Sequence, residues 1–161
     1  SRRREAANLR LRRLAALVLG LCLALGLAGC AGETIEVTVW RSGEGSVALP
    51  ETKRLAPGTG LIPGAVAAFN STPDEPGLER AAPEGADILG WRLEGSELKL
   101  EVSPEWAELS GFEKTVAECC AALSFCALEG VERVSFYLLG QRLGRSIDEG
   151  DIILSAYAEE E

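Results

Sequence analysis

The feature that most constrains this chain is an uncharged apolar segment near its start. The sequence LRRLAALVLGLCLALGLAGC covers residues 11–30, and the 16 positions from Leu14 to Gly29 carry no charge. Six arginines and one glutamate precede these positions. A membrane-spanning helix needs about 20 apolar residues, whereas a signal-peptide core needs roughly 7–15 after a basic start. The length therefore favours a cleaved secretory signal over a membrane span.

The end of this segment indicates which kind of signal it is. Leu27, Ala28, Gly29 and Cys30 resemble the lipobox of bacterial lipoproteins, in which small residues precede a cysteine whose sulfur carries diacylglycerol. We therefore predict that residues 1–29 are a lipoprotein signal peptide. Cys30 would then anchor the protein by lipid at the extracytoplasmic face of the cell membrane, since two acyl chains hold a protein stably. The alternative is an uncleaved anchor helix with a coincidental cysteine.

Charge and composition exclude several classes of function. Residues 1–30 hold 6 of the 16 basic and 1 of the 25 acidic residues, so the remainder has a net charge of about −14. Such a chain repels phosphate backbones, and we expect no nucleic-acid partner. The sequence has no histidine, which excludes Ser-His-Asp and Cys-His catalysis and His-containing metal sites. We expect no cofactor and no metal.

Three further cysteines, Cys119, Cys120 and Cys126, fall in one predicted helix. Cys119 and Cys126 would lie roughly 10 Å apart along the helix axis, and a disulfide needs Cα atoms within about 7 Å. We therefore expect three reduced, buried cysteines that act as small hydrophobic residues.

Alternation of apolar and polar residues predicts the strands. The expected ranges are 34–40, 47–55, 86–93, 97–102 and 134–139, with 152–154 as a candidate for one more. Pro50 either places the second of these at a sheet edge or breaks it.

Helical spacing predicts helices over 61–69 and 111–128, the second with a capping box of Ser110 and Glu113. The second helix carries an apolar stripe made of Phe112, Val116, Cys119, Cys120, Leu123 and Ala127. The order β-β-α-β-β-α-β predicts a two-layer α+β domain with two helices packed on a mixed sheet of four or five strands. We place the lipidated cysteine and a short linker at 30–34, the domain at 35–155 and an acidic tail at 156–161.

One long stretch carries a family resemblance. In GLERAAPEGADILGWRLEGSELKLEVSPEW, residues 77–106, the Pro83-x-Gly85 turn enters a strand, and the return strand ends in Glu101-x-Ser103. This arrangement resembles the GerMN domain, the sporulation and spore germination domain of envelope lipoproteins, although Glu101 stands where the family more often has Asp.

The resemblance continues in CAALSFCALEGVERVSFYLLGQ, residues 120–141. A helix ends there just before a Val-x-x-Val strand and a glycine, which are Val131, Val134 and Gly140. A weaker likeness runs from VTVW to TKRL near the start. Together the matches cover about residues 35–140 and consist of turn and core positions, which specify a fold better than a function.

The resemblance implies a non-enzymatic interaction module on a lipoprotein. Such domains are linked to assembly of the channel between spore compartments and are similar to ring-building modules of secretion systems. In actinobacteria a similar domain occurs on a lipoprotein associated with a two-component sensor. We therefore expect a membrane-proximal protein partner or self-association, in a sporulation, germination or cell-envelope complex.

Two other functions stay open at this point. A sensor of small ligands or cell-wall glycan could use the acidic residues of the hairpin, and a glycan hydrolase would need two of them as a catalytic pair. The candidates are Glu84, Asp87, Glu101 and Glu105. In a strongly acidic protein we expect these four to be solvated surface residues, and we expect no enzyme.

Overall fold

The computed structural model describes residues 34–152. The chain divides into two compact units, residues 1–34 and 35–161, and all described helices and strands belong to the second. The predicted signal peptide, Cys30, most of the predicted linker and the predicted acidic tail lie outside the described residues. Among the described residues, no helix has the length and apolarity needed to cross a bilayer.

The first sheet has three strands in the order β2-β1-β3. β1 (Glu36–Gly43) pairs antiparallel with β2 (Ser46–Arg54) along its length and with the two-residue β3 (Leu78–Glu79) only at its end. Alternation buries Val37 and Val39 on one face of β1. β2 is an unbroken edge strand, the first of the two outcomes expected from Pro50.

The second sheet has five strands. β4 (Ile88–Glu94) and β5 (Glu97–Val102) form an antiparallel hairpin, and β5 pairs parallel with β6 (Arg133–Leu138). The short strands β7 (Gln141–Arg142) and β8 (Ile147–Asp148) pair antiparallel with β6. The 3-10 helix η1 (Glu149–Asp151) follows.

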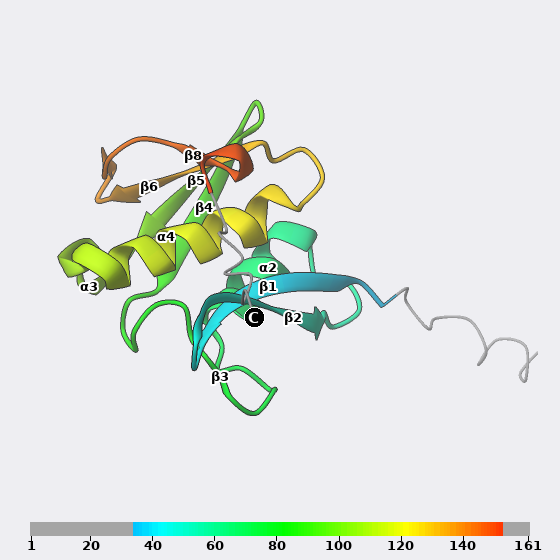
Figure 1. Cartoon of the computed structure of the whole chain (residues 1–161). Helices are drawn as coiled ribbons and strands as arrows, with labels where there is room; N and C mark the ends of the chain where they lie inside the picture. Colours follow the sequence, from blue (N-terminus) through cyan, green and yellow to red (C-terminus); the bar gives the residue numbers. More distant parts are fainter. Residues whose placement is uncertain (1–33, 153–161) are drawn as a thin grey trace, which may run out of the picture. The chain divides into compact units, whose positions relative to one another are not determined.

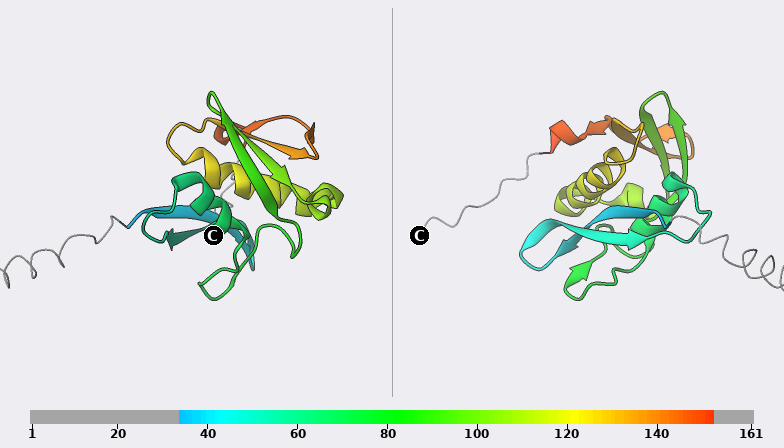
Figure 2. Two further views of the ribbon diagram at one scale, coloured as in Figure 1. Left: turned by 180° about the vertical axis from the view of Figure 1, so that it is seen from behind. Right: turned by 90° about the vertical axis from the view of Figure 1, so that its right-hand side faces the viewer.

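Helix α4 (Gly111–Cys126) lies between the two sheets and contacts β1 on one side and β6 on the other (Figure 1). Helix α2 (Leu61–Asn70) packs on β1 and α4, as the two further views confirm (Figure 2). Small residues allow α4 to approach both sheets closely, and those fully buried on it are Ala117, Cys120, Ala121 and Ala122.

Hydrogen bonds from α4 also serve the backbone of β1. The Trp40 N–H donates to Ser124 Oγ over 2.8 Å, and Ser124 Oγ donates to the Cys120 carbonyl over 2.7 Å. β3 pairs only with the end of β1 and does not reach Trp40. The Ser124 side chain therefore accepts the hydrogen bond that a neighbouring strand would otherwise accept. A buried serine is therefore tolerated because its hydroxyl group is fully used.

A buried ion pair joins the first sheet to the end of α2. Arg41 is 0% and Glu51 1% exposed, and Arg41 Nε donates to Glu51 Oε2 over 2.8 Å. The other two guanidinium nitrogens donate to the carbonyl oxygens of Ala68, Phe69 and Ser71. Arg41 thus satisfies carbonyl groups that the end of a helix leaves without partners.

The second oxygen of Glu51 is equally occupied. Glu51 Oε1 accepts the N–H of Asp74 at 2.6 Å and that of Glu75 at 3.3 Å. Burial raises the pKa of Glu51, but the hydrogen bond from Arg41 and the two amides outweigh it, so the pKa lies below its usual value. The pair fixes the loop after α2 to β2.

The predicted fold class is confirmed as α+β, with helices packed on one antiparallel and one mixed sheet. The strands divide between two sheets because α4 is apolar around much of its circumference and fills the space between them. The strands expected at 34–40, 47–55, 86–93, 97–102 and 134–139 and both helices are present within about three residues of their expected ends. Ile152 is not in a strand but follows η1, and residues 153 and 154 lie outside the described part.

Three predictions for the segment 103–128 are corrected. The structure has an additional helix, α3 (Pro104–Glu108), with Ser103 as its N-cap and Pro at its first position. The capping box at Ser110 is wrong, since Ser110 makes no side-chain cap hydrogen bond. Gly111 has φ +54, and this turn directs the chain so that the Ser110 hydroxyl misses the helix amides. Phe112 was expected in the buried stripe but is 70% exposed.

Candidate interaction surface

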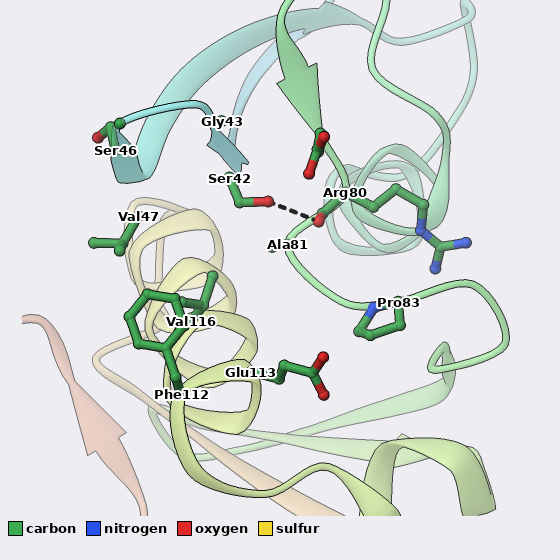
Figure 3. Close-up of a pocket in the computed structure, with 12 residues that line it drawn as sticks. Ser42, Gly43, Ser46, Val47, Arg80, Ala81, Pro83, Phe112, Glu113 and Val116 are labelled. Atoms are coloured by element: carbon green, nitrogen blue, oxygen red, sulfur yellow. Dashed lines mark hydrogen bonds between the residues drawn. The ribbon is translucent and has the colours of Figure 1, made fainter.

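A groove of about 500 Å³ lies between the tip of the β1–β2 hairpin, the chain from β3 to Pro83, and the first turns of α4 (Figure 3). Phe112, Val47 and Val116 lie together on one side, and Arg80 and Pro83 on the other. The groove is therefore apolar along the wall formed by α4 and β2.

Two of these apolar side chains are largely open to solvent. Phe112 is 70% and Val47 46% exposed. The free energy of burying a Phe is about 1.5–3 kcal/mol, and here most of it is not gained within the chain. Clustered exposed apolar side chains mark contact sites on soluble domains. The groove is thus the best candidate for an interaction surface.

The polar groups of the groove hold its walls in place. Ser42 Oγ donates to the Arg80 carbonyl over 2.9 Å, which joins the end of β1 to the chain after β3. The Arg80 guanidinium contacts the Asp87 carboxylate and the Ala86 carbonyl. Glu113, expected to cap α4, instead lines the groove.

Two of the family-motif turns meet at Ser103. Its hydroxyl donates to the Gly85 carbonyl over 2.7 Å and accepts the Asp87 N–H at 3.1 Å and, more weakly, the Trp106 N–H at 3.4 Å. Gly85 has φ +87, as the turn after Pro83 requires. Ser103 and Gly85 are therefore structural, because they bind the entry of β4 to the start of α3.

Another two motif residues meet on the open face of the second sheet. The Gly140 N–H donates to Glu101 Oε1 over 3.3 Å, beside a hollow of about 280 Å³ that also includes Tyr137. Leu139 precedes Gly140 with φ +50 and is 89% exposed.

Of the remaining motif residues, two belong to the core and one to the groove. Val131 and Val134 are buried on either side of the start of β6. Pro83 is exposed and lines the groove. The family motif thus contributes one residue to the groove wall, while Phe112 and Val47 were missed because their helix and strand patterns predict burial.

The four candidate acids differ in their contacts. Asp87 is ion-paired with Arg80, Glu101 is bonded to Gly140, and Glu84 and Glu105 are exposed. Within residues 34–152 no hydrogen bond joins any two of them, and no group of three or more potential ligands could hold a metal ion.

All three described cysteines are free, and only part of the burial prediction holds. Cys120 is buried and its thiol contacts the Val47 carbonyl at 3.3 Å, whereas Cys119 and Cys126 are half-buried. Burial raises the pKa of Cys120 to about 12 and that of Cys126 to about 11. These thiols are therefore protonated at neutral pH and are poor nucleophiles.

Comparison with known proteins identifies the fold. No family model and no curated protein matches the sequence. The tandem GerMN domains of the sporulation protein GerM from Bacillus subtilis superimpose with a TM-score of 0.57 at 10% identity, over 69% of this chain and 41% of that one. The first GerMN domain of the same protein gives a TM-score of 0.55 at 10% identity, over 68% of this chain and 86% of that one.

The described domain is therefore GerMN-like in fold, and the resemblance predicted from the sequence is confirmed at that level. This chain spans about two fifths of the tandem structure and most of the single domain, so it corresponds to one GerMN unit. At 10% identity the likeness concerns the fold alone.

Proposed function

We propose that this chain is a lipid-anchored extracytoplasmic lipoprotein whose GerMN-like domain is a non-enzymatic interaction module. It would assist assembly of a sporulation, germination or cell-envelope complex. The observation that carries this proposal is the apolar groove beside the exposed Phe112. The fold of the first GerMN domain of a sporulation protein supports the biological setting.

The groove favours a polypeptide partner with apolar side chains. Its volume of about 500 Å³ would hold several side chains, and its rim carries Phe112 and Val47. Aromatic anchors that lie partly exposed in the free protein often dominate binding energy. Anchoring through Cys30, only five residues (31–35) before the start of β1, would keep the groove near the membrane, which favours another membrane-proximal ectodomain.

A photocrosslinking amino acid at Ser46, in the groove wall, tests this in cells of the native host. We expect it to capture a membrane protein, and we expect Phe112→Ser to abolish that product. Leu139→Ser is the matched control, because Leu139 is even more exposed than Phe112 but belongs to the β6–β7 turn. A product that survives Phe112→Ser would contradict the role of the groove.

The anchor is tested by Cys30→Ala. If acyl chains on this residue hold the protein, the variant leaves the membrane pellet on fractionation. Retention in the pellet would instead indicate that the apolar segment itself spans the membrane.

A small-ligand or glycan sensor is the second candidate, since the groove is large enough for one sugar-peptide unit. A thermal shift of several degrees with muropeptides or with calcium, lost in Phe112→Ser, would favour it over protein binding. An unchanged melting temperature would count against it.

A further inference from the structure

The outer edge of β4 has no partner along most of its length. β4 is the terminal strand of the second sheet (Figure 2). The two-residue turn Gly95–Ser96 makes Glu94 and Glu97 a hydrogen-bonded pair. Because the direction of backbone groups alternates along a strand, the N–H and C=O groups of Trp91 and Leu93 face outward.

At Ile88, the first residue of β4, the backbone groups of this edge already have hydrogen-bond partners. The Asn70 side chain donates to the Ile88 carbonyl at 2.8 Å and accepts the Ile88 N–H at 3.0 Å, as a paired strand would. No such contact protects Trp91 or Leu93 within the described residues. The free edge is therefore residues 89–94, which we call the β4 edge.

The side chains of the β4 edge are unusually apolar for an exposed strand. Leu89 is 64%, Trp91 44% and Leu93 37% exposed. Trp91 and Leu93 stand opposite the fully buried Leu100 and Leu98, so they continue the core face of the sheet to its border. Proteins normally protect an edge with charges, Pro or a covering segment, and an apolar open edge indicates a strand partner.

The charges of the β4 edge favour a second copy of this chain. The described residues contain ten basic and twenty acidic side chains, so two domains repel each other over most of their surface. On the β4 edge Arg92 Nε lies 2.7 Å from Glu94 Oε1, which makes the strand locally neutral. It is thus a surface where two copies can meet without a net charge.

We propose that two copies pair antiparallel through their β4 edges, with the two-fold axis at Arg92. In this register Trp91 of each copy stands opposite Leu93 of the other, and four outward backbone groups on each strand gain partners. Aromatic and aliphatic residues paired across strands are favourable. Each Arg92 stays beside its own Glu94 and has Glu94 of the other copy as a diagonal neighbour, which offsets the closeness of the two arginines.

The dimer is weak in dilute solution, because a standard interface buries about 1,600 Å² of accessible surface and a single pair of strands buries far less. At a membrane the fraction of dimer would be higher, because confinement raises the effective concentration of the chain. This step rests on the proposed anchoring through Cys30. The interface itself is separate from the groove, so the two proposals fail independently.

Disulfide trapping of the full-length chain in native membranes tests the register. Residues at a non-hydrogen-bonded antiparallel pair have Cα atoms about 4.5 Å apart, within the range of a disulfide. We expect Arg92→Cys to give a covalent dimer under mild oxidation at least tenfold faster than Glu108→Cys, an exposed control on α3. The unsubstituted chain, with its native cysteines, sets the background.

The companion variants make each outcome decisive. Trp91→Lys added to Arg92→Cys should abolish the dimer with the far-UV spectrum unchanged, and Phe112→Ser should leave it intact. Cys30→Ala should lower the yield in cells, and millimolar purified protein should restore it. Equal rates for Arg92→Cys and Glu108→Cys, or a disulfide to a different protein, would overturn the proposal. Faster trapping by Leu93→Cys would overturn the register.

Discussion

The buried pair of Arg41 and Glu51 makes a quantitative prediction about stability. Arg41→Met keeps an unbranched apolar stem of similar length but removes the guanidinium. Glu51 would then keep the amides of Asp74 and Glu75 and lose its principal cationic partner. The carbonyl groups of Phe69 and Ser71 would lose their donor at the same time, whereas the Ala68 carbonyl would keep the hydroxyl and N–H of Ser71.

The cost follows from burial. Removing one partner of a buried ion pair typically costs about 3–5 kcal/mol, because the other charge is left without compensation. Unpaired buried carbonyl groups cost about 1–3 kcal/mol each, but relaxation and water entry make the terms non-additive. We therefore expect Arg41→Met to lower the free energy of unfolding by about 3–5 kcal/mol. A domain has only about 5–15 kcal/mol in total, so the variant should be close to unfolding at 37 °C.

Urea unfolding of a chain beginning at residue 31 measures this difference. The matched control is Arg54→Met in the same hairpin, whose partner Glu36 lies 3.0 Å away but whose side chain is 79% exposed. An exposed pair contributes about 0–1 kcal/mol, so the control should differ little from the wild type. If Arg41→Met costs no more than Arg54→Met, the reasoning from burial is wrong.

The same pair predicts a pH dependence with a definite sign. The folded-state pKa of Glu51 lies below its ordinary value of 4.5, so folding favours the ionised form. The stabilisation is fully present above pH 4.5 and disappears as pH falls through the lower, folded-state pKa. The stability difference between wild type and Glu51→Gln should therefore be constant near neutrality and shrink below pH 4.5.

Three further predictions concern local contacts. Ser103→Ala should lower the free energy of unfolding by about 1–2 kcal/mol and Ser110→Ala by under about 0.5 kcal/mol, since only Ser103 caps its helix; equal urea midpoints would contradict this. Cys120 should react slowly with a thiol reagent in the native protein and rapidly in denaturant, and stability should fall above pH 9 as the unfolded thiol ionises; rapid native labelling would contradict its burial. Leu139→Asn should raise the thermal midpoint by a few degrees, because Asn accepts a positive φ more readily than Leu; a lower midpoint would refute the strain.

Local pattern predicted most of the fold because it acts within one element. Alternation located β1, β4 and β5, and helical spacing located α2 and α4, each from residues less than 20 positions apart. The division into two sheets depends instead on which face of α4 each strand covers. The residues of a single strand do not indicate which face of α4 that strand covers. The sequence therefore predicted one sheet where the structure has two.

The buried charges and the groove escaped prediction for a related reason. Arg41 follows the alternating residues of the predicted strand, and its position in the sequence predicts an ordinary turn residue. Its burial depends on the end of α2, 27 positions away, whose carbonyl groups it binds. Phe112 continues the apolar spacing of α4. However, α4 begins at Gly111 with a positive φ, and the side chain of Phe112 does not lie between the two sheets. β3 was not predicted, because a strand with only two paired residues is too short to show alternation. The chain that begins at β3 forms one wall of the groove.

These exceptions have a common physical meaning. A chain that already buries Trp106, Phe125 and Phe136 in one aromatic cluster has enough core for its size. Phe112 and Trp91 lie outside that cluster and on separate surfaces, one beside a groove and one along an open strand. Exposed aromatic groups lower solubility, and the contacts proposed above would cover both of these side chains. A GerMN-like unit with two such surfaces can join a partner through one and its own copy through the other, which is the minimum needed to extend an assembly beyond a pair.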